Sequence, residues 1–126
     1  MKVLQVIEDA YRGTIEEQDD TIVWLTQSMR QAGGELSVLL NGNAVAYAVE
    51  GQDASGLRFG SWAQTHPPRV DKDLEKLVRS GVAIYVVDED LRRRGLSGTK
   101  LVAGLKVVPR TDVPALFESH DQVWHW

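Results

Sequence analysis

The sequence predicts a three-layer α/β fold, in which a parallel sheet of about five strands carries helices on both faces. Apolar runs typical of strands alternate along the chain with stretches of helical periodicity. Residues 82–87 are apolar at every position, which is typical of a strand covered on both faces inside a parallel sheet. The chain has 126 residues with no repeat or linker, so we expect a single domain over residues 1–126.

The first half of the chain predicts two strands and two helices. Residues 3–7 and 36–40 are rich in branched apolar side chains and predict strands. A capping box at Thr14-Ile15-Glu16-Glu17 predicts the start of a long helix that ends at Gly33-Gly34. Its expected apolar face consists of Ile15, Ile22, Leu25, Met29 and Ala32, and we expect Trp24 to lie in the core. Residues 44–49 predict a short helix.

The middle of the chain contains a stretch without periodicity. Residues 51–69 hold glycines and a Pro67-Pro68 pair, which predicts a long loop. A loop of this length in a small domain is often a binding loop or a contact with another subunit. Asp71 is expected to cap the helix that follows, whose apolar face is Leu74, Leu77 and Val78.

The last third of the chain predicts two further strands and two helices. Residues 88–94 have acids first and arginines last, followed by Gly95, which favours a short helix after the 82–87 strand. Residues 105–108 predict a strand, and Thr111 or Asp112 is expected to cap a helix. That helix is expected to turn Val113, Leu116 and Phe117 inward, and residues 122–126 predict an edge strand.

Composition excludes several classes of chemistry. The chain has no cysteine, which excludes disulfides, thiolate metal sites and a cysteine nucleophile. Its net charge of −4 argues against nucleic-acid binding. Residues 1–9 do not form a signal peptide, and no apolar run is long enough to cross a bilayer, so we expect a cytoplasmic protein without membrane contact.

Polar side chains at the carboxyl ends of the predicted strands are the candidate binding residues, because ligands of such folds bind there. We expect a pocket from Asp9, Tyr11, Asn41, Asn43, Val87, Asp88, Glu89 and Arg110. No phosphate-loop or dinucleotide motif is present, so no cofactor is predicted. The arginines at 92–94 fit either a phosphate contact or a solvated helix end.

A metal-dependent enzyme is the alternative function. Asp9, Asp88 and Glu89 follow two strands, and carboxylates there resemble those of phospho-accepting receiver domains. The third predicted strand ends too late for that family, and the basic residue that it needs is missing at Val108-Pro109. Acids at the starts of helices are also favoured by the helix dipole alone. We therefore predict no metal ligand set, and carboxylates crowded into one pocket would favour the enzyme.

Segments along nearly the whole chain resemble the DsrE-like sulfur-relay family (DsrE, DsrF, TusD and YchN proteins). The resemblance lies in the order and spacing of residues 32–40, 41–45, 77–87, 91–96 and 107–126. Sulfur carriers of the family hold a persulfide on a cysteine that precedes the Arg-Arg-Gly turn. Val87, eight residues before Gly95, stands at that position, so no catalytic residue is carried over. A Val87→Cys variant tests this alignment.

The resemblance implies a cysteine-free, non-catalytic relative that binds a partner protein or a small ligand. It also implies a homo-oligomer, because family assemblies are commonly trimers or hexamers. Trp62, Trp124 and Trp126 are the candidate interface residues, since they lie in a loop or near the end of the sequence where a small domain has difficulty covering them. The alternative is that these tryptophans pack onto their own domain.

Overall fold

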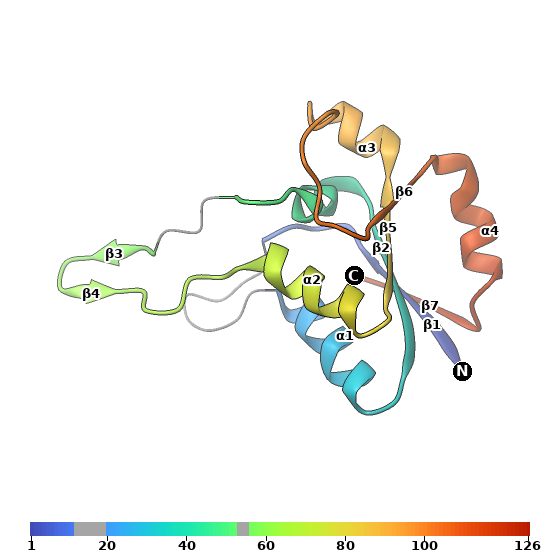
Figure 1. The fold of residues 1–126 in the computed structure, drawn as a ribbon, viewed down its shortest axis with the longest axis horizontal. Helices are drawn as coiled ribbons and strands as arrows, with labels where there is room; N and C mark the ends of the chain where they lie inside the picture. The colour runs from blue at the N-terminus through green and yellow to red at the C-terminus, as the bar shows by residue number, and fades with distance from the viewer. Residues whose placement is uncertain (12–19, 53–55) are drawn as a thin grey trace.

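Five parallel strands form the centre of the structure, a computed structural model that describes residues 1–11, 20–52 and 56–126 (Figure 1). The strands are β1 (Lys2–Ile7), β2 (Glu35–Leu40), β5 (Ala83–Val87), β6 (Lys106–Val108) and β7 (Gln122–His125). They lie in the order β6-β5-β2-β1-β7, and each neighbouring pair is parallel. The predicted fold class is confirmed, with the strand at the end of the sequence at one edge.

Strand β5 lies inside the sheet, between β2 and β6. Ile84 and Val86 point to one face and are completely buried, while Val87 points to the other face and is buried as well. Apolar side chains are therefore needed at successive positions, which is why this strand shows no alternation. The prediction of an inner strand at residues 82–87 is confirmed.

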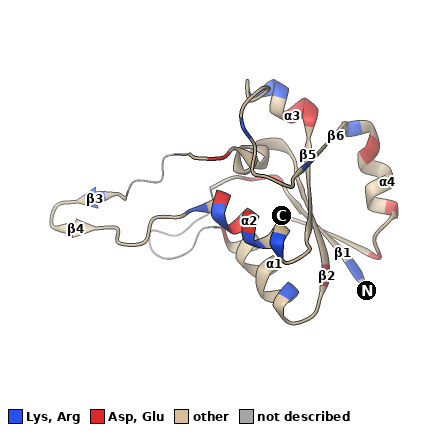
Figure 2. Cartoon of the chain, viewed as in Figure 1, with Lys and Arg blue, Asp and Glu red and all other residues tan. Residues whose placement is uncertain are grey.

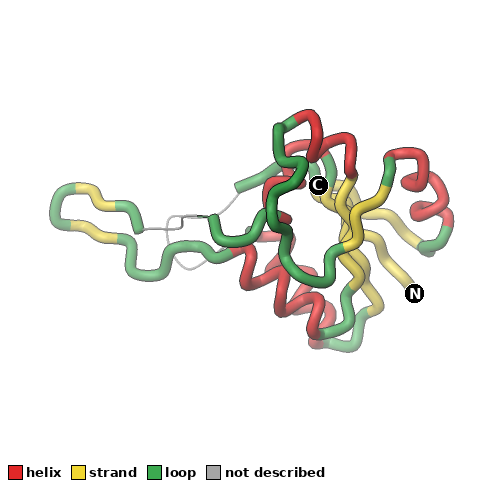
Figure 3. The backbone as a smooth tube through the Cα atoms, turned by 45° about the horizontal axis from the view of Figure 1, so that its top comes forward, coloured by secondary structure: helices red, strands yellow, loops and turns green. Residues whose placement is uncertain are grey.

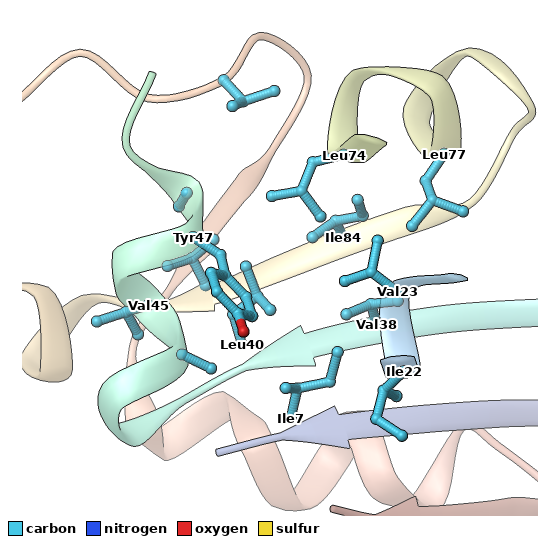
Figure 4. Packing of buried hydrophobic residues seen from close by; sticks show 14 of the residues in the cluster. Ile7, Ile22, Val23, Val38, Leu40, Val45, Tyr47, Leu74, Leu77 and Ile84 are labelled. Atoms are coloured by element: carbon cyan, nitrogen blue, oxygen red, sulfur yellow. The ribbon is translucent and has the colours of Figure 1, made fainter. Parts of the chain in front are cut away.

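Helices cover both faces of the sheet, as Figures 1 and 3 show. One face packs against α1 (Thr21–Gln31), α2 (Val70–Arg79) and the 3₁₀ helix η1 (Gly42–Ala48). Figure 4 shows this larger core, in which Ile7, Val38 and Ile84 from the sheet meet Val23 and Leu77 from the helices. Complete burial of each such side chain contributes roughly 1.5–3 kcal/mol to folding.

The second face has a smaller core under α4 (Val113–Glu118). Leu4, Val6, Leu39 and Val87 are buried there, and Val113 and Leu116 pack against them. Phe117 is exposed, so the prediction that it faces inward is wrong. A six-residue helix presents only one narrow side to a sheet, and Val113 and Leu116 occupy it.

Helix α1 differs in part from its prediction. It begins at Thr21, and Asp20 caps it by accepting hydrogen bonds from the backbone N–H groups of Ile22 and Val23. The predicted capping box at Thr14 and the apolar residue Ile15 lie outside the described residues. Trp24 is 58% exposed, so its predicted place in the core is wrong. The buried side of the helix consists of Ile22, Val23 and Thr26.

The predicted loop at residues 51–69 contains a two-stranded hairpin, so the prediction of an unstructured loop is wrong in part. Strands β3 (Arg58–Phe59) and β4 (Trp62–Ala63) pair in antiparallel fashion, apart from the main sheet. Figure 1 shows this hairpin, which we call the arm, extending well away from the body. The following helix has Arg69 at its N-cap position, and Asp71 lies inside its first turn instead of capping it.

Asp88–Arg93 forms the predicted short helix α3, and Gly95 after it has a positive φ of 66°. The 3₁₀ turn η2 (Arg110–Asp112) joins β6 to α4. Within the described part of the chain, no helix has the length and apolar character that a membrane span requires.

Candidate functional site

A cavity of about 510 Å³ lies at the carboxyl edge of the sheet, where segments that follow four strands meet. We call it the arginine cavity. It is lined by Glu8, Asn41, Gly42, Asn43, Asp90, Arg93, Arg94 and Arg110. Glu8 follows β1, the three residues from Asn41 follow β2, α3 follows β5, and Arg110 follows β6. Figure 2 shows the basic residues of α3 near this edge.

Asp90 joins three of these segments. Its side chain is almost completely buried, and Oδ2 accepts a hydrogen bond of 2.8 Å from the backbone N–H of Gly42. Oδ1 accepts a hydrogen bond from Nη2 of Arg110 and lies 4.0 Å from Nη1 of Arg94. Gly42 has a positive φ of 53°, and a Cβ there would meet the Glu8 carbonyl oxygen at 3.3 Å. A glycine therefore suits this turn, which brings the backbone up to Asp90.

The arginines of the cavity have different partners. Arg94 donates hydrogen bonds of 2.8 and 3.2 Å to Oδ1 of Asn43, an acceptor that carries no charge. Arg93 is exposed, and among the described residues its guanidinium has no hydrogen bond or ion pair. Arg92, on the same helix, lies outside the cavity and pairs with Asp88. Within the described part of the chain, Arg93 is therefore the cavity arginine that no carboxylate pairs with, whereas Arg94 and Arg110 share Asp90.

The charge balance of the arginine cavity is positive. Three guanidinium groups line it against two carboxylates. Of these two, Asp90 pairs with Arg110, and Glu8 lies 2.9 Å from Nε2 of His125. A positive concavity on a chain whose net charge is −4 is a local feature that attracts anions.

A second cavity of about 680 Å³, which we call the tyrosine cavity, adjoins the first. It is lined by Asp9, Ala10, Tyr11, Asn43, Ala46, Arg94 and Leu96. Asn43 and Arg94 line both cavities. This one is more apolar, because Ala10, Ala46 and Leu96 contribute to its wall.

Tyr11 is held in an uncommon conformation beside the tyrosine cavity. Its φ is 60°, in the left-handed region that residues other than glycine rarely adopt. Its backbone N–H donates a hydrogen bond to the Tyr47 hydroxyl, which in turn donates one of 2.6 Å to the buried carboxylate of Asp20. The Tyr11 hydroxyl donates to Gln52. These contacts fix Tyr11 at its backbone and at its hydroxyl, although the residue is 60% exposed.

The predicted pocket residues separate into three groups. Asn41, Asn43 and Arg110 line the arginine cavity, whereas Asp9, Tyr11 and Asn43 line the tyrosine cavity. The remaining three, Val87, Asp88 and Glu89, line neither of these cavities.

These three residues have other roles in the fold. Val87 is completely buried on the face that α4 covers. Asp88 accepts a hydrogen bond from Arg92 and raises the pKa of that guanidinium above its ordinary value. The Glu89 carboxylate accepts hydrogen bonds of 2.9 and 3.1 Å from the backbone N–H of Arg110. Among residues 1–11, 20–52 and 56–126, no three His, Asp or Glu side chains are grouped as a metal site requires.

The predicted pocket did not include Asp90, Arg93 or Arg94, although a phosphate contact was one of the two interpretations of the arginines at 92–94. A signal for two of them exists, because Leu91 is the one large apolar residue of α3 and must face the core. Asp90 precedes Leu91 and Arg94 lies three residues after it, on neighbouring sides of the helix. Acids and arginines on the helix sides next to such a buried residue are candidates for lining a cavity.

Comparisons with known proteins identify the fold. No family model and no curated protein sequence matches the chain. The YchN protein from E. coli is similar in structure, with a TM-score of 0.76, 19% identity and coverage of 99% of this chain and 98% of that one. A protein of unknown function from Methanobacterium thermoautotrophicum, MTH1491, has a TM-score of 0.63, 16% identity and coverage of 98% and 97%. The DsrE-like fold that the sequence resemblance implies is confirmed.

Proposed function

We propose that this chain is a DsrE-like protein that carries no sulfur and acts as a binding subunit. It holds an anionic group, from a small ligand or from a partner protein, in the arginine cavity at the carboxyl edge of its sheet. It performs no persulfide transfer. As expected from its sequence, we place it in the cytoplasm.

The observation that carries the first half of this proposal is the environment of Val87. The resemblance aligns Val87 with the family's sulfur-carrying cysteine, and the chain holds no cysteine elsewhere. Val87 is completely buried between β-strand neighbours and α4, as part of an apolar cluster. The position serves packing, and a valine provides no nucleophile.

The arginine cavity supports the second part of the proposal, that the chain binds an anionic group. Its lining comes from four separate segments, and the buried Asp90 connects Gly42 and Arg110 by direct hydrogen bonds. Such connections hold the guanidinium of Arg110 in place before a ligand arrives, which reduces the entropy lost on binding. Arginine is well suited to planar, two-point recognition of carboxylates and phosphates.

Assembly into a trimer, or a dimer of trimers, completes the proposal. The number of subunits comes from the family resemblance alone. The arm gives an independent argument for contact between copies. Its Phe59 and Trp62 rings are stacked with their centroids 5.8 Å apart, and both remain exposed. An isolated two-stranded hairpin is marginally stable in water, so a partner surface would stabilise it. Trp126 argues less strongly, because its indole N–H donates to Gln5 of its own chain at 2.7 Å.

Native mass spectrometry of untagged protein tests this function, because it reports the number of subunits and any retained ligand together. We expect a trimer or hexamer carrying a small anion. Incubation with a small-molecule persulfide donor, followed by intact mass measurement under mild conditions, is expected to leave the mass of the chain unchanged. A stable gain of one sulfur atom localised to a peptide would overturn the proposal.

A further inference from the structure

We propose that the arginine cavity and the tyrosine cavity together bind one small molecule that joins an anionic group to a planar aromatic ring, as a mononucleotide does. The inference deepens the proposed function and rests on it, because it names the class of ligand for the same edge of the sheet.

The anionic group belongs in the arginine cavity. Among the described residues Arg93 has no partner, and the side chain of Arg94 donates to the uncharged amide oxygen of Asn43 and lies 4.0 Å from the Asp90 carboxylate. Arg110 keeps part of its guanidinium available, since one hydrogen bond to Asp90 uses only one of its five N–H groups. Several arginines around one concavity suit a group with two or three anionic oxygens, such as a phosphate.

The ring belongs in the tyrosine cavity. Tyr11 is fixed at its backbone by Tyr47 and at its hydroxyl by Gln52, yet 60% of it remains exposed. The Tyr47 ring meets it edge to face, with centroids 5.3 Å apart, so the two rings are not stacked on each other. Small side chains at Ala10 and Ala46 leave room for a flat group beside it. A base can stack on a tyrosine ring because every base has a flat π-face.

The two cavities are neighbours, because Asn43 and Arg94 line both. A ligand with both parts would therefore lie across the Asn43–Arg94 hydrogen bond, with its anion on one side and its ring on the other. An isolated anion would leave the more apolar cavity filled only by water. The volumes of about 510 and 680 Å³ are each within the ordinary range for small-molecule sites.

Isothermal titration calorimetry with three probes tests this inference. Adenosine monophosphate is expected to bind at least about tenfold more tightly than inorganic phosphate or adenosine, because only it occupies both cavities. If phosphate binds as tightly as adenosine monophosphate, the ring site is refuted while the anion site of the proposed function stands. If none of the three probes binds, the proposed anion site fails as well.

Matched variants show whether the binding occurs at these residues. Arg93→Gln is expected to weaken the binding of adenosine monophosphate about tenfold, while Arg92→Gln, the same change one position earlier and outside the cavity, leaves it within about twofold. Tyr11→Asn removes the ring but tolerates the positive φ, and it is expected to weaken adenosine monophosphate and spare phosphate. Tyr11→Phe keeps the ring and loses only the hydroxyl contact with Gln52, so it should bind adenosine monophosphate more tightly than Tyr11→Asn does. Equal affinities in Arg93→Gln and Arg92→Gln, or in Tyr11→Asn and Tyr11→Phe, would overturn the inference.

Discussion

Nη2 of Arg110 donates a hydrogen bond to Oδ1 of Asp90, a carboxylate that is almost completely buried. The two residues lie on different segments, one after β6 and one in α3. Asp90 also accepts the backbone N–H of Gly42, from the turn after β2. One carboxylate therefore ties together three of the four segments that line the arginine cavity.

Asp90→Asn is expected to lower the free energy of unfolding by about 2 kcal/mol, because an amide cannot replace both charge-assisted hydrogen bonds of a buried carboxylate. Urea denaturation followed by circular dichroism measures the change. Asp88→Asn is the matched control, since it makes the same change in the same helix at an exposed pair with Arg92. Its effect should be much smaller. Equal losses in both variants would show that Asp90 has no special role.

Tyr47→Phe is expected to lower the free energy of unfolding by about 1–2 kcal/mol. The hydroxyl it removes donates to the buried Asp20 carboxylate at 2.6 Å and accepts the backbone N–H of Tyr11. Asp20 also caps α1, so its carboxylate would lose one of three donors inside the core. Tyr11→Phe removes only the exposed contact with Gln52 and serves as the control. Thermal unfolding curves that coincide for the two variants would contradict this account.

Val87→Cys is expected to fold and to remain unreactive in the native state. The side chain at this position is completely buried in an apolar cluster, and such surroundings raise the pKa of a thiol and exclude reagents. A thiol reagent should label the variant slowly in buffer and fully in denaturant. Rapid labelling of the folded variant, or uptake of one sulfur atom from a persulfide donor, would show that the position is accessible as in a sulfur carrier.

The fold was predictable because its central strands are apolar at successive positions. The run at residues 82–87 identifies the inner strand β5 without any knowledge of its neighbours. Trp24 and Thr26 were not predictable in the same way. The helix buries Thr26, whose hydroxyl donates to the carbonyl oxygen of Ile22 at 2.8 Å, and it leaves Trp24 exposed. Hydrophobicity alone cannot anticipate a polar group that is satisfied by its own helix.

The candidate site was predictable only as an edge of the sheet. The turn at Asn41 and Asn43 and the residue Arg110 follow strands directly, so the topology places them at the carboxyl edge. Which residues of α3 line the cavity depends on the rotation of the helix about its axis. That rotation sends Asp88 and Arg92 outward and brings Asp90 and Arg94 to the cavity. Three consecutive acids and three consecutive arginines do not reveal this rotation. It becomes predictable only when Leu91 is taken as the residue that faces the core.

Phe59→Ser combined with Trp62→Ser is expected to reduce assembly while leaving the secondary structure of the body unchanged. Both rings lie on the arm, stacked on each other and away from the main sheet, so few contacts within the chain depend on them (Figure 1). Aromatic side chains of this kind stabilise interfaces because they bury a large area with few rotatable bonds. Light scattering at micromolar concentration should give a wild-type mass near three or six times 14.0 kDa and a lower mass for the double variant. Arg58→Ser, a change on the same strand without loss of an aromatic ring, should assemble as the wild type does. A wild-type mass that stays at 14.0 kDa on concentration would refute assembly, and a dimer would refute only the number of subunits.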